Sequence, residues 1–339
     1  MKISQLSLRN VRALPDLDRS LVDRSKKPHD VILVTGPTGS GKTRLLEAIA
    51  LWKEAAAPYG APPKRDALAG PRGASGEIAG TWEMTPDEVR RGVLSTPSPK
   101  VSVEVGLGAP TPQVEKGLRK VLSDFFRVPT HGKIEYFPAN RRLSDRPLPV
   151  PLDALSEKVE APMRTDRDAD KYGVERAWLT ARLEADLAAA GSTLEGRGVL
   201  LSRQAPDSLA QARASIAKLC PHLRLSGLGK NGNRVEPRLL RAGADARADR
   251  AEVWLSEISA GEEQAVLFAA AFQRLALSRS VILIDTPELG LHPADHARFF
   301  RALCALGEDN QIIAATTSPG ILATASPDQI LDLSPERRS

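Results

Sequence analysis

The pattern of apolar positions over the first fifty residues predicts two strands and then a helix. Ile3, Leu6 and Leu8 begin an apolar pattern of the strand type, and residues 30–35 (DVILVT) form a continuous apolar run that suits a buried central strand. A glycine-rich turn follows, after which apolar residues recur at helical spacing over Arg44–Trp52. This part of the chain is therefore predicted to run from a buried strand through a tight turn into a helix.

The remaining chain keeps changing between strand-like and helix-like spacing. A helix start is marked by Thr85 as N-cap, Pro86 at the first helical position and Glu88, which completes a capping box. Strands are predicted at 101–107, 133–137, 234–241, 252–255, 281–284, 312–316 and 329–333, and helices at 114–126, 172–190, 208–219, 262–277 and 294–306. Strands that alternate with helices around a glycine-rich turn indicate an α/β fold with a largely parallel sheet.

Two segments depart from this alternation. Residues 58–76 are loaded with Pro, Gly and Ala and are predicted to form an exposed, mobile loop. Residues 151–222 are rich in Ala, Arg, Asp and Leu with helical spacing, which indicates a helical insertion far too short for a long coiled-coil arm. The chain is accordingly divided into residues 1–150, the insertion 151–222, and residues 223–339, and no internal repeat is found.

Composition narrows the class of protein. The 339 residues are 42% hydrophobic and 26% charged, which is a globular balance with room for one large α/β domain or two small ones. No run approaches 18 apolar residues, and the opening MKISQLSLRN has no apolar core of signal-peptide length. Cys220 and Cys304 lie far apart and show no metal-ligand spacing. With no sign of secretion, we interpret them as reduced core thiols of a cytoplasmic protein, and no membrane partner is expected.

The net charge of +5 is compatible with a nucleic-acid partner but does not demand one. A solvated surface is the simpler interpretation of the local arginine clusters, and contact with a partner is the alternative. The clusters comprise Arg141 and Arg142, then Arg164 and Arg167, and then Arg238, Arg241, Arg247 and Arg250.

The glycine-rich turn satisfies GxxxxGK[ST] and lies between an apolar strand and a helix, as this phosphate-binding motif requires. Its glycines let successive backbone N–H groups face phosphates, while Lys42 neutralises the β/γ oxygens and the Thr43 hydroxyl ligates Mg²⁺. We therefore predict an ATP and Mg²⁺ site. Its candidate residues are Gly36, Pro37, Thr38, Gly39, Ser40, Gly41, Lys42, Thr43 and Arg44.

The run VILID, residues 281–285, is the natural second half of this site. Four apolar residues suit a buried neighbouring strand, and Asp285 then emerges at the end of the sheet where doubly wound folds bind ligands. Asp285 would hold Mg²⁺ directly or through water. Taken alone, the pattern is equally typical of a plain core strand, so its position downstream of the phosphate loop carries the interpretation.

Residues 258–264, ISAGEEQ, lie at the start of a predicted helix just before that strand. Ser259 and Glu262 would form a capping box, but a capped helix does not explain the spacing to Asp285. The segment resembles the signature of the ABC-ATPase superfamily, LSxGE followed by Gln or a basic residue. This resemblance implies that Ser259, Gly261 and Glu262 contact nucleotide. It also implies an α/β P-loop NTPase fold of the ABC-ATPase type, with a mostly parallel central sheet, an antiparallel subdomain and a short helical insertion.

Further segments are similar to the SMC, RecF and OLD-like branch of that superfamily. The opening ISQLSLRNVRALPDLD resembles its first strand, which implies that Arg12 lies near the adenine. LIDTPELGLHP (283–293) and ATTSPGIL (315–322) resemble its LIDEPExxLHP and ATHSPxxL segments. EYFPANRR (135–142) resembles the YIPAxR segment of its small standalone AAA-type members. By this resemblance, residues 1–150 and 223–339 are the two parts of one ATPase domain.

The chain also departs from the family at catalytic positions. The glutamate that normally follows Asp285 is Thr286, and the switch histidine is Thr317. A threonine hydroxyl cannot accept a proton near neutral pH, and loss of a general base costs about 10²–10⁴ in rate. We therefore expect ATP binding with slow turnover. Glu288 is a candidate substitute base, and Asn140 is the nearest polar candidate for the absent Q-loop glutamine.

The family resemblance also implies partners. The signature of one protomer caps the γ-phosphate held by its twin, so an ATP-sandwich homodimer or a larger assembly is expected. The leading hypothesis is a regulatory subunit of a DNA-linked or anti-phage defence complex, with a separately encoded nuclease or toxin as effector. An active RecF-like ATPase that handles DNA, a structural scaffold without catalysis and a transporter ATPase remain alternatives. His292 is expected to pack or to contact the partner protomer.

Overall fold

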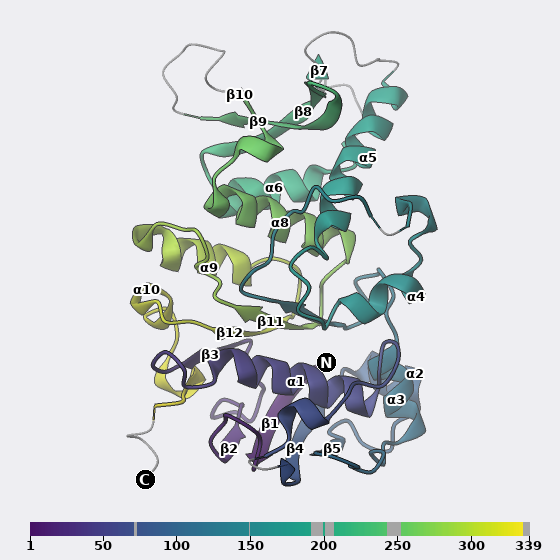
Figure 1. The fold of residues 1–339 in the computed structure, drawn as a ribbon, viewed down its shortest axis with the longest axis vertical. Helices are drawn as coiled ribbons and strands as arrows, with labels where there is room; N and C mark the ends of the chain where they lie inside the picture. The colour runs from purple at the N-terminus through teal and green to yellow at the C-terminus, as the bar shows by residue number, and fades with distance from the viewer. Residues whose placement is uncertain (71–72, 149, 191–198, 201–206, 243–251, 335–339) are drawn as a thin grey trace.

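The computed structural model describes residues 1–70, 73–148, 150–190, 199–200, 207–242 and 252–334. Its centre is a five-stranded sheet with the strand order β13–β3–β12–β11–β6, of which Figure 1 labels β3, β12 and β11. Every pair of neighbouring strands in this sheet is parallel, so the predicted sheet is confirmed. The strands are β3 (Val31–Thr35), β6 (Ile134–Phe137), β11 (Val281–Asp285), β12 (Gln311–Ala315) and β13 (Ile330–Asp332).

Side chains of β3 alternate between the two faces of this sheet. Leu33 belongs to a core shared with α8 and α9, whereas Ile32 and Val34 belong to a core shared with α1. Figure 1 shows α1 below the sheet and α8 and α9 above it, so the sheet separates α1 from α8. The main helices are α1 (Lys42–Ala56), α5 (Gly173–Ala189), α6 (Ala210–Leu219), α8 (Ala260–Arg274) and α9 (His296–Cys304).

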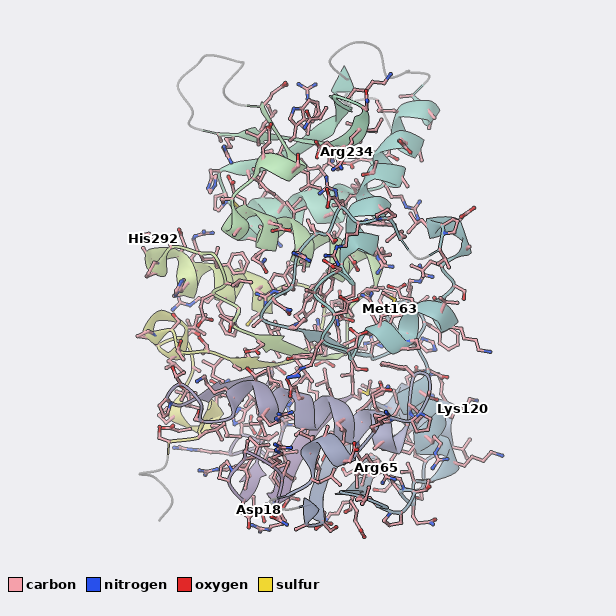
Figure 2. The ribbon with its side chains drawn as sticks, viewed as in Figure 1. Asp18, Arg65, Lys120, Met163, Arg234 and His292 are labelled. Carbon is pink, nitrogen blue, oxygen red and sulfur yellow. The ribbon has the colours of Figure 1, made fainter. Side chains whose placement is uncertain are left out.

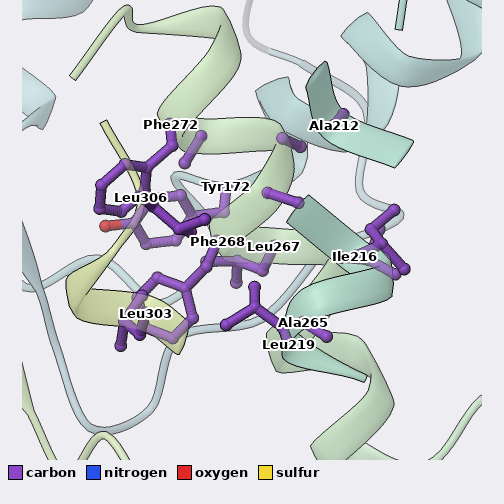
Figure 3. Packing of buried hydrophobic residues seen from close by; sticks show 14 of the residues in the cluster. Tyr172, Ala212, Ile216, Leu219, Ala265, Leu267, Phe268, Phe272, Leu303 and Leu306 are labelled. Carbon is purple, nitrogen blue, oxygen red and sulfur yellow. The ribbon is translucent and has the colours of Figure 1, made fainter. Parts of the chain in front are cut away.

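The core that lies above the central sheet in Figure 1 contains buried residues of α5, α6, α8 and α9. Phe268 and Phe272 of α8 lie in one cluster with Ile216 of α6 and Leu303 of α9 (Figure 3). Because α5 and α6 bury apolar residues in the same cluster, the helices expected at 172–190 and 208–219 pack against the rest of the ATPase core. The boundaries at residues 150 and 222 remain predictions.

Two antiparallel sheets complete the fold, as the sequence predicted for the subdomain. One has the order β2–β1–β4–β5 and the other β10–β9–β8–β7. The patterns of β2, β4 and β8 were not recognised in the sequence. The strands are β1 (Lys2–Arg9), β2 (Leu17–Ser20), β4 (Gly76–Glu83), β5 (Lys100–Val105), β7 (Val199–Leu200), β8 (Leu223–Asn231), β9 (Arg234–Arg241) and β10 (Glu252–Trp254).

Three of the four shorter α-helices described begin at a side-chain cap, which is Thr85 for α2, Ser156 for α4 and Ser318 for α10. The Thr85 hydroxyl accepts from the Glu88 N–H at 3.3 Å, and the Glu88 carboxylate accepts from the Thr85 N–H at 2.8 Å, so the predicted capping box is confirmed. Across the described ranges, no helix combines the length and apolar character needed to cross a bilayer. These helices are α2 (Pro86–Gly92), α3 (Lys116–Ser123), α4 (Glu157–Glu160) and α10 (Pro319–Leu322).

The expectation that residues 58–76 form an exposed loop is wrong for part of the segment, of which 71–72 lie outside the described residues. Tyr59 and Leu68 are buried. The Tyr59 hydroxyl accepts a hydrogen bond from the Ile134 N–H at 2.9 Å, which satisfies a backbone donor of the edge strand β6. Single buried anchors among prolines and glycines leave no periodic pattern, so the sequence could not reveal them.

The interpretation of the arginine clusters as surface is wrong for Arg164, which is fully buried; Arg247 and Arg250 lie outside the described residues. The Arg164 guanidinium lies 3.2 Å from Glu160 and 3.4 Å from Glu175, and Arg274 of α8 donates to both carboxylates. Burial alone would raise the pKa of Glu160, but the two arginines outweigh it and lower the pKa to about 2. This buried network fastens residues 157–175 to α8.

We expect Arg164→Met to lower the free energy of unfolding by about 3–5 kcal/mol, because Arg274 alone would then face the buried carboxylates of Glu160 and Glu175 and one buried negative charge would be left uncompensated. Urea titration followed by circular dichroism measures the loss. The control is Arg167→Met, since Arg167 is 62% exposed and pairs with Glu47. Arg167→Met should lower the free energy of unfolding by less than about 1 kcal/mol. Equal losses in the two variants would contradict the stabilising function assigned to the network.

Candidate functional site

The phosphate loop joins β3 to α1 in a conformation that only glycines adopt easily. Gly36, Gly39 and Gly41 have φ angles of 141°, 83° and 97°, all in the left-handed half of the Ramachandran map. Helix α1 has no side-chain cap and no acidic residue in its first turn. Its first N–H groups therefore lack partners within the helix and carry partial positive charge, which suits a phosphate chain.

Side chains of the loop fit the same ligand. The Lys42 ammonium lies across the loop and donates to the carbonyl oxygens of Gly36 and Pro37, both at 2.9 Å. Ser40 Oγ is buried without a hydrogen-bond partner among the described residues. Arg44 instead points along α1 and donates to Glu47 at 3.0 Å, so its guanidinium has a partner within the helix. The loop thus offers an ammonium that is held by backbone carbonyl oxygens and carries no carboxylate partner among the described residues, together with an unused hydroxyl, for an anionic ligand.

The two predicted magnesium ligands meet at the end of the sheet. Thr43 Oγ1 donates to Asp285 Oδ2 at 2.7 Å, although 242 positions separate them in sequence. Asp285 ends β11 and is only 3% exposed. Two oxygen ligands beside a phosphate loop fit Mg²⁺, which binds through one or two protein oxygens and completes its shell with phosphates and water.

A cavity of about 390 Å³ opens beside the phosphate loop. Arg12, expected near the adenine, is exposed and does not line it. An added Cβ on Gly41 would lie 2.6 Å from the Ala13 carbonyl oxygen, so the segment after β1 packs directly on the loop. The cavity is lined by Ala13, Leu14, Pro15, Pro37, Thr38, Gly39, Ser40 and Leu333.

The segment after Asp285 contacts the switch segment at 316–318. Glu288 Oε1 accepts from Thr316 Oγ1 at 2.8 Å and from the Thr317 N–H at 3.2 Å. Thr317 is exposed, and Thr286 adopts a left-handed φ of 51° while its N–H donates to Ala315. Glu288 is therefore held by Thr316 and Thr317, whereas Thr286 directly follows Asp285, the predicted metal ligand.

His296 was not singled out in the sequence, but it links the same two segments. Its Nδ1 lies 2.8 Å from Ser318 Oγ and its Nε2 lies 3.2 Å from the Leu291 carbonyl oxygen. His292 lies at the left edge of the molecule in Figure 2, where its ring accepts from the Ala294 N–H at 3.3 Å. The position of His292 at the start of a short helix is compatible with a contact to a partner.

The signature residues lie at the start of α8. Ser259 is exposed, and its hydroxyl accepts from the Glu262 N–H at 3.3 Å. The predicted contact of Glu262 with nucleotide is not supported, because its carboxylate accepts from the Ser259 N–H at 2.8 Å and from Arg241 at 2.7 Å. Burial alone would raise the pKa of Glu262, but these hydrogen bonds outweigh it and lower the pKa to about 2. Glu262 therefore shapes the turn that presents Ser259.

Close packing explains why the first turn of α8 has a glycine at position 261. A Cβ at this position would lie 2.7 Å from the Gly290 carbonyl oxygen. The signature therefore packs closely on the segment that follows Asp285. Among the described residues, no hydrogen bond or ion pair joins residues 36–44 to residues 258–264, and α1 and α8 cover opposite faces of the sheet (Figure 1). The fold does not bring the two halves of the predicted nucleotide site together within one chain.

A family model described as "AAA domain, putative AbiEii toxin, Type IV TA system" matches residues 31–323. A second model, "Type II/IV secretion system protein", matches only residues 2–55, which contain the phosphate loop. A search of curated proteins found no match.

Solved structures with the same fold include two SMC head domains. One is the SMC head bound to the C-winged helix domain of ScpA, with a TM-score of 0.53 and 13% identity over 97% of this chain and 96% of that one. The other is the SMC head with an extended coiled coil bound to the C-terminal domain of ScpA from Pyrococcus furiosus, with a TM-score of 0.52 and 13% identity over 98% and 93%. The predicted SMC-like α/β fold of the ABC-ATPase type is confirmed.

Proposed function

The chain belongs to the AAA-domain family whose model matches residues 31–323, and from that premise we propose that it is a nucleotide-gated dimeric clamp that binds ATP tightly and hydrolyses it slowly. The observation that carries this proposal is the division of the site. Lys42, Thr43 and Asp285 lie at one end of the sheet, while Ser259 is exposed at the start of a helix that covers the opposite face from α1.

The phosphate-binding half is complete in one chain. Lys42 and the first N–H groups of α1 would hold the phosphate chain, and the cavity beside Ala13 and Leu14 would take the nucleoside. Thr43 and Asp285 would hold Mg²⁺, which supplies charge neutralisation at the phosphates. These residues support binding of ATP without any contribution from the signature.

Closure of the site requires a second chain. Ser259 and Gly261 have no contact with the phosphate loop of their own protomer among the described residues, and Ser259 faces solvent. A twofold axis that places each signature over the partner's phosphate loop creates two equal composite sites. ATP then holds the two protomers together, and its hydrolysis or release lets them part.

Hydrolysis should be slow because Thr286 occupies the position next to the metal-binding aspartate and carries no base. We expect Thr286→Glu to raise the rate of phosphate release at least about tenfold, since a positioned general base contributes about 10²–10⁴. The control is Thr286→Gln, which has the same size but cannot accept the proton. An equal rise in both variants would contradict the idea that a missing base limits the rate.

Glu288 is the other candidate for the general base, and the same phosphate-release assay tests it. Glu288→Gln keeps an amide oxygen as acceptor for Thr316 and Thr317, so it should preserve the switch contacts. If Glu288 only holds the switch segment, the slow rate stays within about threefold of the wild type, whereas a general base would cost about 10²–10⁴.

We propose that the clamp regulates a separately encoded effector such as a nuclease or toxin. The description of the family, which places its AAA domain in a toxin–antitoxin system, supports a role within a module of more than one protein. The test is co-purification with the product of a neighbouring gene in the presence and absence of ATP. ATP-dependent capture of one such protein is the expected result. Turnover stimulated by DNA and lost in Lys42→Ala would instead favour a RecF-like ATPase.

A further inference from the structure

One buried arginine holds the backbone at the end of β11. Arg141 follows β6 and is only 2% exposed. Its Nη1 donates to the carbonyl oxygens of Asp285 at 2.6 Å and Pro138 at 3.0 Å, and its Nη2 donates to the Thr286 carbonyl oxygen at 3.0 Å. The planar guanidinium therefore fixes the peptide groups on both sides of the left-handed Thr286 turn.

The same stretch of chain also contacts the signature helix. The Arg141 guanidinium carbon lies 5.0 Å from the ring centre of Phe268 on α8. Two residues later, the Leu143 N–H donates to Glu263 Oε1 of α8 at 2.6 Å. Residues 138–143, the bridge segment, thus contact both the end of β11 and the first turn of α8.

A buried cation without a carboxylate partner needs a strong reason to persist. Among the described residues Arg141 forms no ion pair, and burial lowers its pKa to about 10, so it stays charged at neutral pH. Its Nη1 and Nη2 groups satisfy carbonyl oxygens at a point where the chain turns from β11 into the segment that packs on Gly261. The expectation that Arg141 forms part of a partner-contacting surface is therefore wrong.

We infer that Arg141 is a positioning residue that keeps Asp285 in place for the metal–nucleotide complex, and that the bridge segment couples this end of β11 to the signature helix. The inference rests on the proposed function, because it assigns Asp285 to the metal. It predicts that loss of Arg141 harms the metal-dependent part of nucleotide binding and spares the part made by the phosphate loop.

The test measures the dissociation constant of a fluorescent ATP analogue in Mg²⁺ and in EDTA. For Arg141→Met, the constant in EDTA should stay within about twofold of the wild type. The tightening produced by Mg²⁺ should fall at least about tenfold, since groups that orient a metal ligand are worth 10–100-fold in metal affinity. Arg142→Met is the control, because Arg142 is exposed and pairs with Asp170 at 2.6 Å; it should keep the full tightening.

Arg141→Lys keeps the charge but loses the planar pair of donors, so it should lose part of the Mg²⁺-dependent tightening of binding. If Arg141→Met does not fold, Arg141→Lys takes its place as the test of the inference. Full Mg²⁺-dependent tightening in a folded Arg141→Met, or in Arg141→Lys in its place, overturns the inference alone. A wild type without any Mg²⁺-dependent tightening overturns the proposed function as well.

Two substitutions of Glu263 test the contact between the bridge segment and α8. Glu263→Ala removes the acceptor of the Leu143 N–H, whereas Glu263→Gln retains an oxygen in its place. Because one hydrogen bond of this kind is worth about 1 kcal/mol, Glu263→Ala should reduce the tightening about fivefold and Glu263→Gln should not. Identical behaviour of the two variants would overturn the coupling through the bridge segment.

Discussion

Replacement of Ser259 by aspartate is expected to abolish ATP-dependent dimerisation without unfolding the protein. Aspartate caps a helix as well as serine does, so α8 should keep its first turn. Its negative charge would face the phosphates held by the partner, and like charges at close range in a water-poor interface cost several kcal/mol. Light scattering in the presence of ATP and Mg²⁺ measures the association.

The control for this prediction is Ser259→Asn, which caps equally well and carries no charge. It should dimerise with an affinity within about tenfold of the wild type, because one neutral hydrogen bond is worth about 1 kcal/mol. Both variants should melt at the same temperature as the wild type. Normal ATP-dependent dimerisation of Ser259→Asp would show that the signature does not face a nucleotide.

Lys42→Ala is expected to weaken ATP binding about 100-fold, because hydrogen bonds from a charged group contribute about 1.5–3 kcal/mol and the lysine also neutralises phosphate charge. The protein should remain folded, since among the described residues the Lys42 side chain bonds only to the carbonyl oxygens of Gly36 and Pro37. Calorimetric titration with ATP and Mg²⁺ provides the measurement.

Arg44→Ala is the matched control for Lys42→Ala. Arg44 lies two positions further along α1, and its side chain already pairs with Glu47. Its loss should change the ATP affinity less than about threefold, because its guanidinium pairs within the helix at i,i+3 and such a pair is worth less than about 1 kcal/mol. An equal effect of the two variants would mean that general positive charge, and not the position of Lys42, determines affinity.

The elements of the central sheet were predictable because continuous apolar runs such as 281–284 are typical of strands that are buried on both faces. Strand β4, which lies in the antiparallel sheet β2–β1–β4–β5, could not be predicted, since Gly76 and Gly80 interrupt its apolar pattern. The reason for one of these glycines lies far away in sequence: a Cβ on Gly80 would come within 2.8 Å of Trp52, whose ring stacks on Trp82 at 4.7 Å. Such a packing constraint leaves no trace in local periodicity.

The site divides in the same way. The phosphate loop is contiguous, so its residues and their chemistry could be predicted directly from the motif. The contacts of Glu262 with Arg241 and His222 could not be predicted, because these partners lie about 20 and 40 positions away in sequence, at the ends of the β8–β9 hairpin. Arg141 was misjudged because an arginine in a charged cluster is usually exposed, and only the fold shows that it meets the carbonyl oxygens of β11.

The most direct test of the composite site is a mixing experiment with two defective protomers. Lys42→Ala keeps its signature and Ser259→Asp keeps its phosphate loop, so only a mixed dimer regains one complete site. Each variant alone should stay monomeric with ATP and Mg²⁺, and an equimolar mixture of differently tagged chains should form a mixed dimer. A mixture that stays monomeric while the wild type dimerises would contradict the account.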